Sequence, residues 1–178
     1  MFTRNVSQND VVHSIDDSLL LILNLNNLVA SHFHEAISRI ESLKELPAVT
    51  IISFDFIVGD LDKMSEIFVC LKRRQSEGEK RIDREIRPAS LFIAGAYLED
   101  QISICALNAL AVGYDVFLLN DATAPRDTVQ RETFIARLTQ AGVVLSTVQQ
   151  MLYQWLAVEL DIDRKNALRK LLGYPVSI

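Results

Sequence analysis

Short runs of consecutive apolar residues alternate along this chain with longer amphipathic stretches, and this alternation restricts the fold more than any other feature. Apolar side chains at nearly every position, as in residues 49–52, are typical of strands buried on both faces. Such strands, separated by amphipathic helices, build a parallel sheet with helices on either side. We therefore predict an α/β fold with a three-layer, doubly wound, mostly parallel sheet of five or six strands. The predicted strands are Leu19–Leu25, Val49–Ser53, Ser90–Ala94, Val116–Leu119 and Val143–Ser146.

Helices are predicted between these strands where apolar side chains are spaced three and four residues apart. Residues 33–46 show this pattern up to Pro47, which ends a helix. Residues 128–141 show it up to Gly142, which can end a helix in a left-handed conformation. Ile67–Leu71 is either a sixth strand or part of a helix. The apolar positions of the two helices are Phe33, Ile37, Ile40, Leu43, Phe134, Ile135, Leu138 and Ala141.

The C-terminal region, residues 149–178, is predicted to form two helices after the last strand. Its large apolar side chains, Trp155 and Leu168 among them, pack either on the sheet of the same chain or on a second subunit. We expect a homo-oligomer in which this region is a contact. Two further segments lie outside the predicted sheet: an N-terminal arm, residues 1–17, and the densely charged Gln75–Arg87, which is expected to be an exposed helix or loop.

A single domain is expected over residues 1–178, because a chain of this length buries about 70% of its unfolded surface. The composition, 49% hydrophobic and 23% charged, is that of a globular protein, and the apolar runs are too short to span a membrane. Residues 1–17 contain no apolar segment of signal-peptide type, so a cytoplasmic location is expected. The net charge of −5 and the single basic triplet, residues 72–74, predict no nucleic-acid or membrane partner.

Neither the cysteines nor the histidines predict a bound metal or cofactor. Cys70 and Cys105 both lie in apolar segments and are expected to be buried free thiols. His32 and His34 are two residues apart, which separates them by about 200° on a helix, and His13 lies in the N-terminal arm. We therefore expect no metal site and no cofactor.

The second half of the chain, residues 95–147, carries small motifs in a fixed order. Gly95 ends a predicted strand, and Gln101 follows six residues later at the start of the next predicted helix. The further motifs are Ala106–Leu110, Gly113–Val116, Asn120-Asp121-Ala122, Gln140-Ala141-Gly142 and Val143–Thr147. This order and spacing resemble the isochorismatase-like cysteine hydrolase superfamily, the relatives of nicotinamidase and N-carbamoylsarcosine amidase. The resemblance implies an isochorismatase-like, Rossmann-like fold.

The resemblance also implies a catalytic triad, whose positions this chain fills with other residues. In the family a Cys opens the helix at the position of Gln101, and an Asp ends the first strand at the position of Asn24. The family's Lys follows a middle strand, and Lys72 is its only candidate, since Ser53–Pro88 otherwise lacks a match. A glutamine amide is no nucleophile at neutral pH and an asparagine amide cannot accept a proton, so two of the three roles are empty.

Further candidates stand where predicted strands end, because ligands bind at the carboxyl ends of strands in open α/β sheets. Tyr97 is either a platform for a ligand or a packed aromatic ring. Glu99 and Asp100 are either an acid/base pair or, as we favour, acids that complement a helix dipole. Asp121 is expected to hold the turn after it, with Arg126 as one candidate partner. The candidate pocket residues are Asn24, Asp55, Tyr97, Gln101 and Asn120.

Two functions are compatible with this sequence. The first is a catalytically inactive relative of these hydrolases, which binds a small carbonyl or amide compound through Asn24 and Gln101 or acts in an assembly. The second is an active hydrolase of amide-like or isochorismate-like substrates whose nucleophile has moved to Cys105, one helical turn beyond Gln101. We favour the first, because the fold pattern is kept while base and nucleophile are both replaced.

Overall fold

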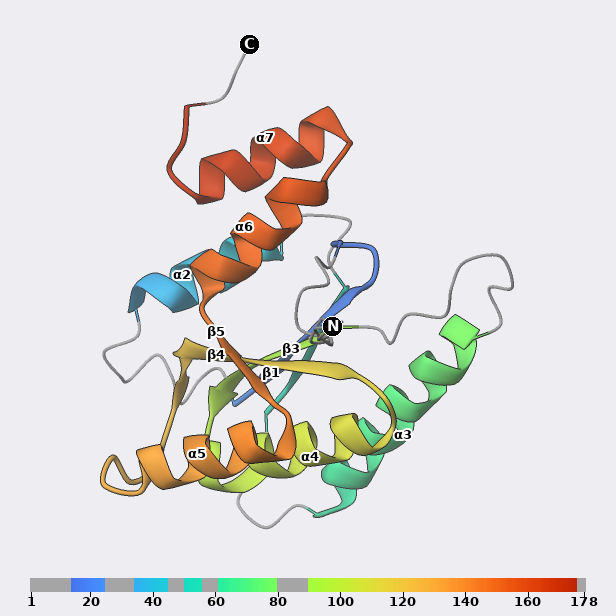
Figure 1. The fold of residues 1–178 in the computed structure, drawn as a ribbon, viewed down its shortest axis with the longest axis vertical. Coiled ribbons are helices and arrows are strands. Elements are labelled where there is room, and N and C mark those ends of the chain that lie inside the picture. Colours follow the sequence, from blue (N-terminus) through green and yellow to red (C-terminus); the bar gives the residue numbers. More distant parts are fainter. Residues whose placement is uncertain (1–13, 25–33, 45–49, 56–60, 80–89, 176–178) are drawn as a thin grey trace, which may run out of the picture.

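The computed structural model describes residues 14–24, 34–44, 50–55, 61–79 and 90–175. The strands are β1 (Ser18–Leu23), β2 (Thr50–Phe54), β3 (Ser90–Ala96), β4 (Asp115–Ala124) and β5 (Val144–Ser146). The helices are α2 (His34–Leu43), α3 (Leu61–Glu79), α4 (Ser103–Ala111), α5 (Arg131–Ala141), α6 (Val148–Val158) and α7 (Ile162–Leu171), with a π-helical turn, η2 (Leu98–Ile102). The strands form one parallel sheet in the order β2-β1-β3-β4-β5 between two layers of helices (Figure 1), which confirms the predicted fold class.

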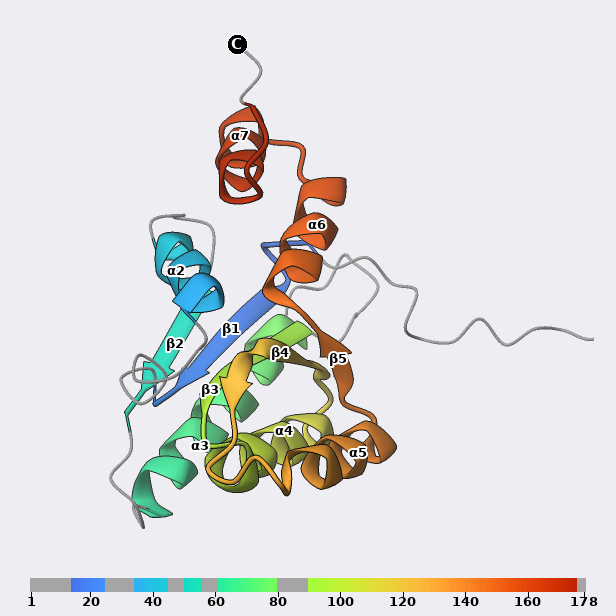
Figure 2. The same ribbon diagram turned by 90° about the vertical axis from the view of Figure 1, so that its left-hand side faces the viewer.

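Alternate residues of the central strands face opposite helical layers. Leu20 and Ile22 of β1 share a core with α2 and α6, whereas Leu19 and Leu21 share one with α3, α4 and α5. Figures 1 and 2 show these two layers on either side of the sheet, with α7 beyond α6. Every residue of β1 and β3 is buried, as their continuous apolar runs predict. The same prediction is wrong for β2, which is only partly buried because it lies at the edge of the sheet.

The predicted helices form, one residue departs from the expected pattern, and the open choice for Ile67–Leu71 is settled. Gly142 ends α5 with a φ of 110°, as predicted, but Ala141 is exposed rather than part of the apolar face. Ile67–Leu71 belongs to α3, which continues into the charged segment as far as Glu79, so it is not a sixth strand. Outside the described residues lie Phe33, Pro47, residues 80–87 of the charged segment and residues 1–13 of the N-terminal arm.

β4 runs beyond its predicted end at Leu119 because it contains a bulge. Its pairing with β3 shifts between Ile93 and Gly95, whose successive partners are Leu118 and Thr123. Within the bulge the hydroxyl of Thr123 donates to the carbonyl oxygen of Leu119 at 2.8 Å. Polar residues such as Asn120 and Asp121 are typical of a turn. In this structure they lie inside β4, at the bulge where the strand bends.

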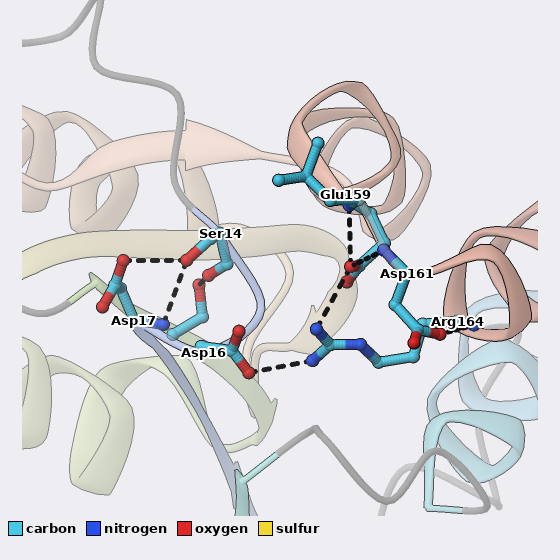
Figure 3. Close-up of polar contacts among 8 residues, drawn as sticks. Ser14, Asp16, Asp17, Glu159, Asp161 and Arg164 are labelled. Atoms are coloured by element: carbon cyan, nitrogen blue, oxygen red, sulfur yellow. Dashed lines mark hydrogen bonds and ion pairs between the residues drawn. The ribbon is translucent and has the colours of Figure 1, made fainter.

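An ion-pair cluster attaches the start of α7 to the residues before β1 (Figure 3). The guanidinium of Arg164 donates to Asp16 Oδ1 at 2.9 Å and lies 3.2 Å from Glu159 Oε1. The hydrogen bond to Asp16 is the main reason that the pKa of Arg164 is raised. Glu159 is buried, and its Oε1 also accepts the backbone N–H groups of Leu160 and Asp161 at 2.9 Å each. The two predicted C-terminal helices therefore form and are fixed to the body of their own chain.

Candidate functional site

The ends of three neighbouring strands meet at Asn24, the residue that the resemblance aligns with the family's Asp. Asn24 is 2% exposed and has a φ of 53°, a left-handed conformation that asparagine tolerates. Its backbone N–H donates to the carbonyl of Phe54 in β2 at 2.8 Å, and its side-chain Nδ2 donates to the carbonyl of Ala96 in β3 at 2.6 Å. An ionised carboxylate only accepts hydrogen bonds, so an ionised Asp at this position could not make the second contact.

Gly95 allows β1 and β3 to approach each other directly beside Asn24. Its φ is 130°, and a Cβ atom on it would lie 1.8 Å from the carbonyl oxygen of Leu23. No side chain fits in that space, so the glycine is required by the backbone of the site. The peptide bond between Ala96 and Tyr97 is cis, and Tyr97 leads directly into η2.

Gln101, the residue that the resemblance aligns with the family's nucleophile, lies in the π-helical turn η2. Its side-chain oxygen, Oε1, is buried and has no hydrogen-bond partner among the described residues. Buried acceptors are normally paired, and single π-helical turns occur frequently at functional sites. Ser90 Oγ and Gln154 Oε1 are buried without a partner among the described residues in the same way. A carboxamide oxygen such as that of Gln101 can accept an N–H or O–H group.

The other polar side chains of η2 hold the loop that follows β4. The Glu99 carboxylate accepts the backbone N–H of Arg126 at 2.9 Å and that of Asp127 at 2.9 Å. The guanidinium of Arg126 donates to Asp100 Oδ2 at 2.7 Å and lies 4.4 Å from the centroid of the Tyr97 ring. The two acids thus bind a loop and a cation in addition to standing at a helix start. These contacts are not predictable from the sequence, because the partners are 26 to 28 residues apart in the chain.

The remaining candidate residues have other surroundings. The side-chain oxygen of Asn120 accepts a hydrogen bond from Arg131 on α5. Asp121 accepts the first backbone N–H of α6 at 2.9 Å, so it holds the start of a distant helix rather than the turn after it. Asp55 follows β2 and is exposed. Lys72 is exposed within α3, so it does not follow a strand as the family's Lys does.

Cys105 lies in the core between the sheet and the layer of α3, α4 and α5. It is 2% exposed, and burial raises the pKa of its thiol from 9.0 to about 12. A reactive thiol needs the opposite conditions, namely access to solvent and a lowered pKa. The prediction of a buried free thiol is confirmed for Cys105, whereas Cys70 on α3 is only partly buried.

Cys105 is expected to resist thiol reagents in the folded protein at neutral and mildly alkaline pH. With a thiol pKa of about 12, fewer than roughly one in a thousand molecules are ionised at pH 9. Because the pKa is raised by folding, the stability linked to this group is complete below about pH 9. It falls by about 1.4 kcal/mol per unit as the pH rises toward the folded pKa.

The check is a reagent titration with mass-spectrometric mapping of the label, in wild type and in Cys70→Ser, which leaves one thiol. Labelling of Cys105 at the rate of a free thiol at pH 7 would contradict its burial and favour the relocated nucleophile.

Other features of the described residues lie away from this site. No group of three or more His, Cys, Asp or Glu side chains among them is placed to hold a metal ion. Within the described ranges, no helix is long and apolar enough to cross a membrane. His34 begins α2 and is exposed, whereas His13 and His32 lie outside those ranges. Surface hollows of about 430 and 320 Å³ lie on α3 and between β5 and α6, and neither is lined by Asn24 or Gln101.

Comparison with known proteins gives one partial sequence match and several structural ones. No family model matches the chain. The probable hydrolase YcaC of Escherichia coli is 35% identical over 74 residues, which are 42% of this chain and 32% of YcaC. A crystal structure of YcaC from that organism, described as an octameric hydrolase of unknown specificity, superimposes with a TM-score of 0.62 at 19% identity, over 90% of each chain.

Two further structures share the architecture. YcaC from Pseudomonas aeruginosa, solved with hexane-2,5-diol and covalent acrylamide, gives a TM-score of 0.63 at 18% identity, over 97% of this chain and 93% of that one. An isochorismatase-like hydrolase from Alkaliphilus metalliredigens gives 0.51 at 16% identity, over 82% and 98%. Such likenesses define the fold, whereas chemistry depends on the residues of the site. The chain therefore has the isochorismatase-like fold, and the resemblance to the isochorismatase-like hydrolases that its sequence carries is confirmed.

Proposed function

We propose that this protein is a catalytically inactive isochorismatase-like protein that binds a small carbonyl or amide compound beside Asn24 and Gln101. The contact that carries the proposal is the hydrogen bond from Asn24 Nδ2 to the carbonyl of Ala96. A working site needs a proton acceptor at this position and a thiolate at position 101. Asn24 acts as a donor instead, and losing the nucleophile ends a covalent mechanism.

The class of ligand follows from the groups that the site offers. Gln101 Oε1 is a buried acceptor without a partner among the described residues, so it favours a ligand with an N–H or O–H donor. A primary carboxamide supplies two N–H donors and a carbonyl acceptor.

Benzamide is expected to stabilise the folded protein without being hydrolysed. A ligand at a hundred times its Kd adds about 2.7 kcal/mol to the unfolding free energy, or roughly 5–10 °C in Tm for a chain of this size. Gln101→Ala should lose this shift, whereas Gln140→Ala, an exposed glutamine on α5, should keep it. Thermal unfolding measures the shift in Tm, and an assay for released ammonia measures hydrolysis of benzamide.

Release of ammonia by the wild-type protein that Gln101→Ala abolishes would contradict this proposal. So would a benzamide shift that is equal in both glutamine variants. The active alternative is not proposed, because the burial of Cys105 removes the exposure and ionisation that a nucleophilic thiol requires.

We also propose that copies of this chain assemble through the C-terminal helices. At the junction of α6 and α7, Leu160 and Ile162 are 92% and 73% exposed. Tyr153 and Tyr174 form a second exposed pair, with their hydroxyl oxygens 2.7 Å apart. Both pairs belong to the segment from α6 to Tyr174, and exposed apolar surface of this kind is typical of subunit contacts. E. coli YcaC, which has the same fold, is octameric.

Light scattering is expected to give a mass that is a multiple of the 20.1 kDa chain. The double variant Leu160→Asp, Ile162→Asp should lower that mass, because it places charges in the contact. Val129→Asp, at a position that is 86% exposed before α5, should leave the mass unchanged. A wild-type protein with the mass of one chain would refute the assembly.

A further inference from the structure

Tyr97 and Asp100 hold the side chain of Arg126 in the manner in which proteins hold a cationic ligand. The guanidinium lies 4.4 Å from the centroid of the Tyr97 ring and donates to Asp100 Oδ2 at 2.7 Å. Proteins commonly bind organic cations with an aromatic ring face and a carboxylate together. In this structure the cation comes from the chain itself.

The Arg126 side chain can leave this position without releasing its loop. The backbone of the loop is held separately, by hydrogen bonds from the N–H groups of Arg126 and Asp127 to the Glu99 carboxylate. The side chains of Arg126 and Asp100 are 48% and 44% exposed, and ion pairs with such exposure contribute little to stability. Replacing the Arg126 guanidinium with a cation of similar shape therefore costs little stability.

Two neighbouring features favour a cationic ligand with several N–H groups. Gln101, the residue after Asp100, carries the buried oxygen that lacks a donor among the described residues. Asp100 pairs with the Arg126 side chain, and the Glu99 carboxylate accepts the backbone N–H of Arg126. Two carboxylates therefore lie beside one guanidinium, so the local charge favours a cation and disfavours an anion.

We propose that the site takes a small organic cation, an amidine or guanidine on a flat ring, which displaces Arg126 from Tyr97 and pairs with Asp100. This inference rests on the proposed binding function at Gln101 and narrows its ligand from carboxamides to their cationic isosteres. Arg126 is then the internal occupant of a ligand site, and its removal opens the site.

Benzamidine, benzamide and benzoate test the inference, because they share one shape and differ in charge. By calorimetry, benzamidine is expected to bind the wild type about fivefold or more tightly than benzamide, and benzoate most weakly. Asp100→Asn should remove that preference, and Asp100→Glu should keep it. Arg126→Ala should tighten benzamidine binding, whereas Arg137→Ala, an exposed arginine on α5, should leave it unchanged. Unliganded melting curves verify that each variant is folded.

The outcomes separate this inference from the proposed function. If benzamide binds in a way that depends on Gln101 and benzamidine binds no more tightly, the cation site is refuted and the proposed function stands. If benzamidine binding depends on Asp100 while Gln101→Ala affects neither compound, the cation site stands and the role of Gln101 fails. Tightest binding of benzoate, or no binding of any compound to wild type and Arg126→Ala, overturns the inference.

Discussion

Replacing Gly95 with alanine is expected to remove most or all of the stability of this protein. The added Cβ would lie 1.8 Å from the carbonyl oxygen of Leu23, inside the backbone of the neighbouring strand, where no side-chain movement can relieve the contact. Relief requires β1 and β3 to separate at the centre of the sheet. We expect a loss of more than about 4 kcal/mol, which is a large part of the 5–15 kcal/mol that usually stabilises a domain.

Gly142→Ala is the matched control for this prediction. Gly142 also has a positive φ, 110°, but the nearest atom to its Cβ would be Leu110 Cδ2 at 3.9 Å. The control therefore measures backbone strain without the steric contact, and about 1–3 kcal/mol is expected. Denaturant unfolding gives both values, with yield of soluble protein as the readout if Gly95→Ala does not fold. Equal losses in the two variants would show that the approach of β1 and β3 is not as close as described.

Trp155→Ala is expected to cost about 3–5 kcal/mol, because it deletes the largest fully buried side chain of the core. The indole packs edge-on against Phe92, with ring centroids 5.7 Å apart, and its N–H donates to the hydroxyl of Ser18 at 3.1 Å. These contacts attach α6 to β1 and β3. The variant leaves a cavity between the helix and the sheet and removes the N–H that the Ser18 hydroxyl accepts, while the bond from that hydroxyl to the carbonyl oxygen of Ser14 remains.

Tyr153→Ala, at a position that is 39% exposed on the same helix, should cost within about 1 kcal/mol. Urea unfolding followed by circular dichroism compares the two variants on one scale. A similar midpoint for both would mean that α6 is not held by its tryptophan.

The architecture was predictable because the spacing of apolar residues along the sequence indicates which side chains are buried. β1 and β3 are continuous apolar runs, and alternate residues of each face the two helical layers. The same reasoning failed for β2, since a run of similar hydrophobicity lies at a sheet edge. It left Ile67–Leu71 undecided, because a short apolar run fits a strand or a buried helix face equally well.

The site was predictable in part. Asn24 and Gln101 were found from their places in a family pattern, and the structure describes both beside the ends of β1 and β3. The contacts of Arg126 with Tyr97 and Asp100 were not predictable, because they join residues on opposite sides of α4 and β4 in the chain. A short sequence pattern does not predict which loops become neighbours when the sheet forms.

By itself the sequence determined the parallel sheet and its helical layers, and it placed Asn24 and Gln101 where the resemblance expects a base and a nucleophile. These features depend on the identity of single residues and on the spacing of apolar residues over a few positions, and both can be seen directly in the sequence. The tertiary structure alone decided that Asn24 donates to Ala96, that Cys105 is buried, and that Arg126 occupies the face of Tyr97. Each of these depends on distances between segments far apart in the chain, and packing fixes such distances only when the whole sheet has formed.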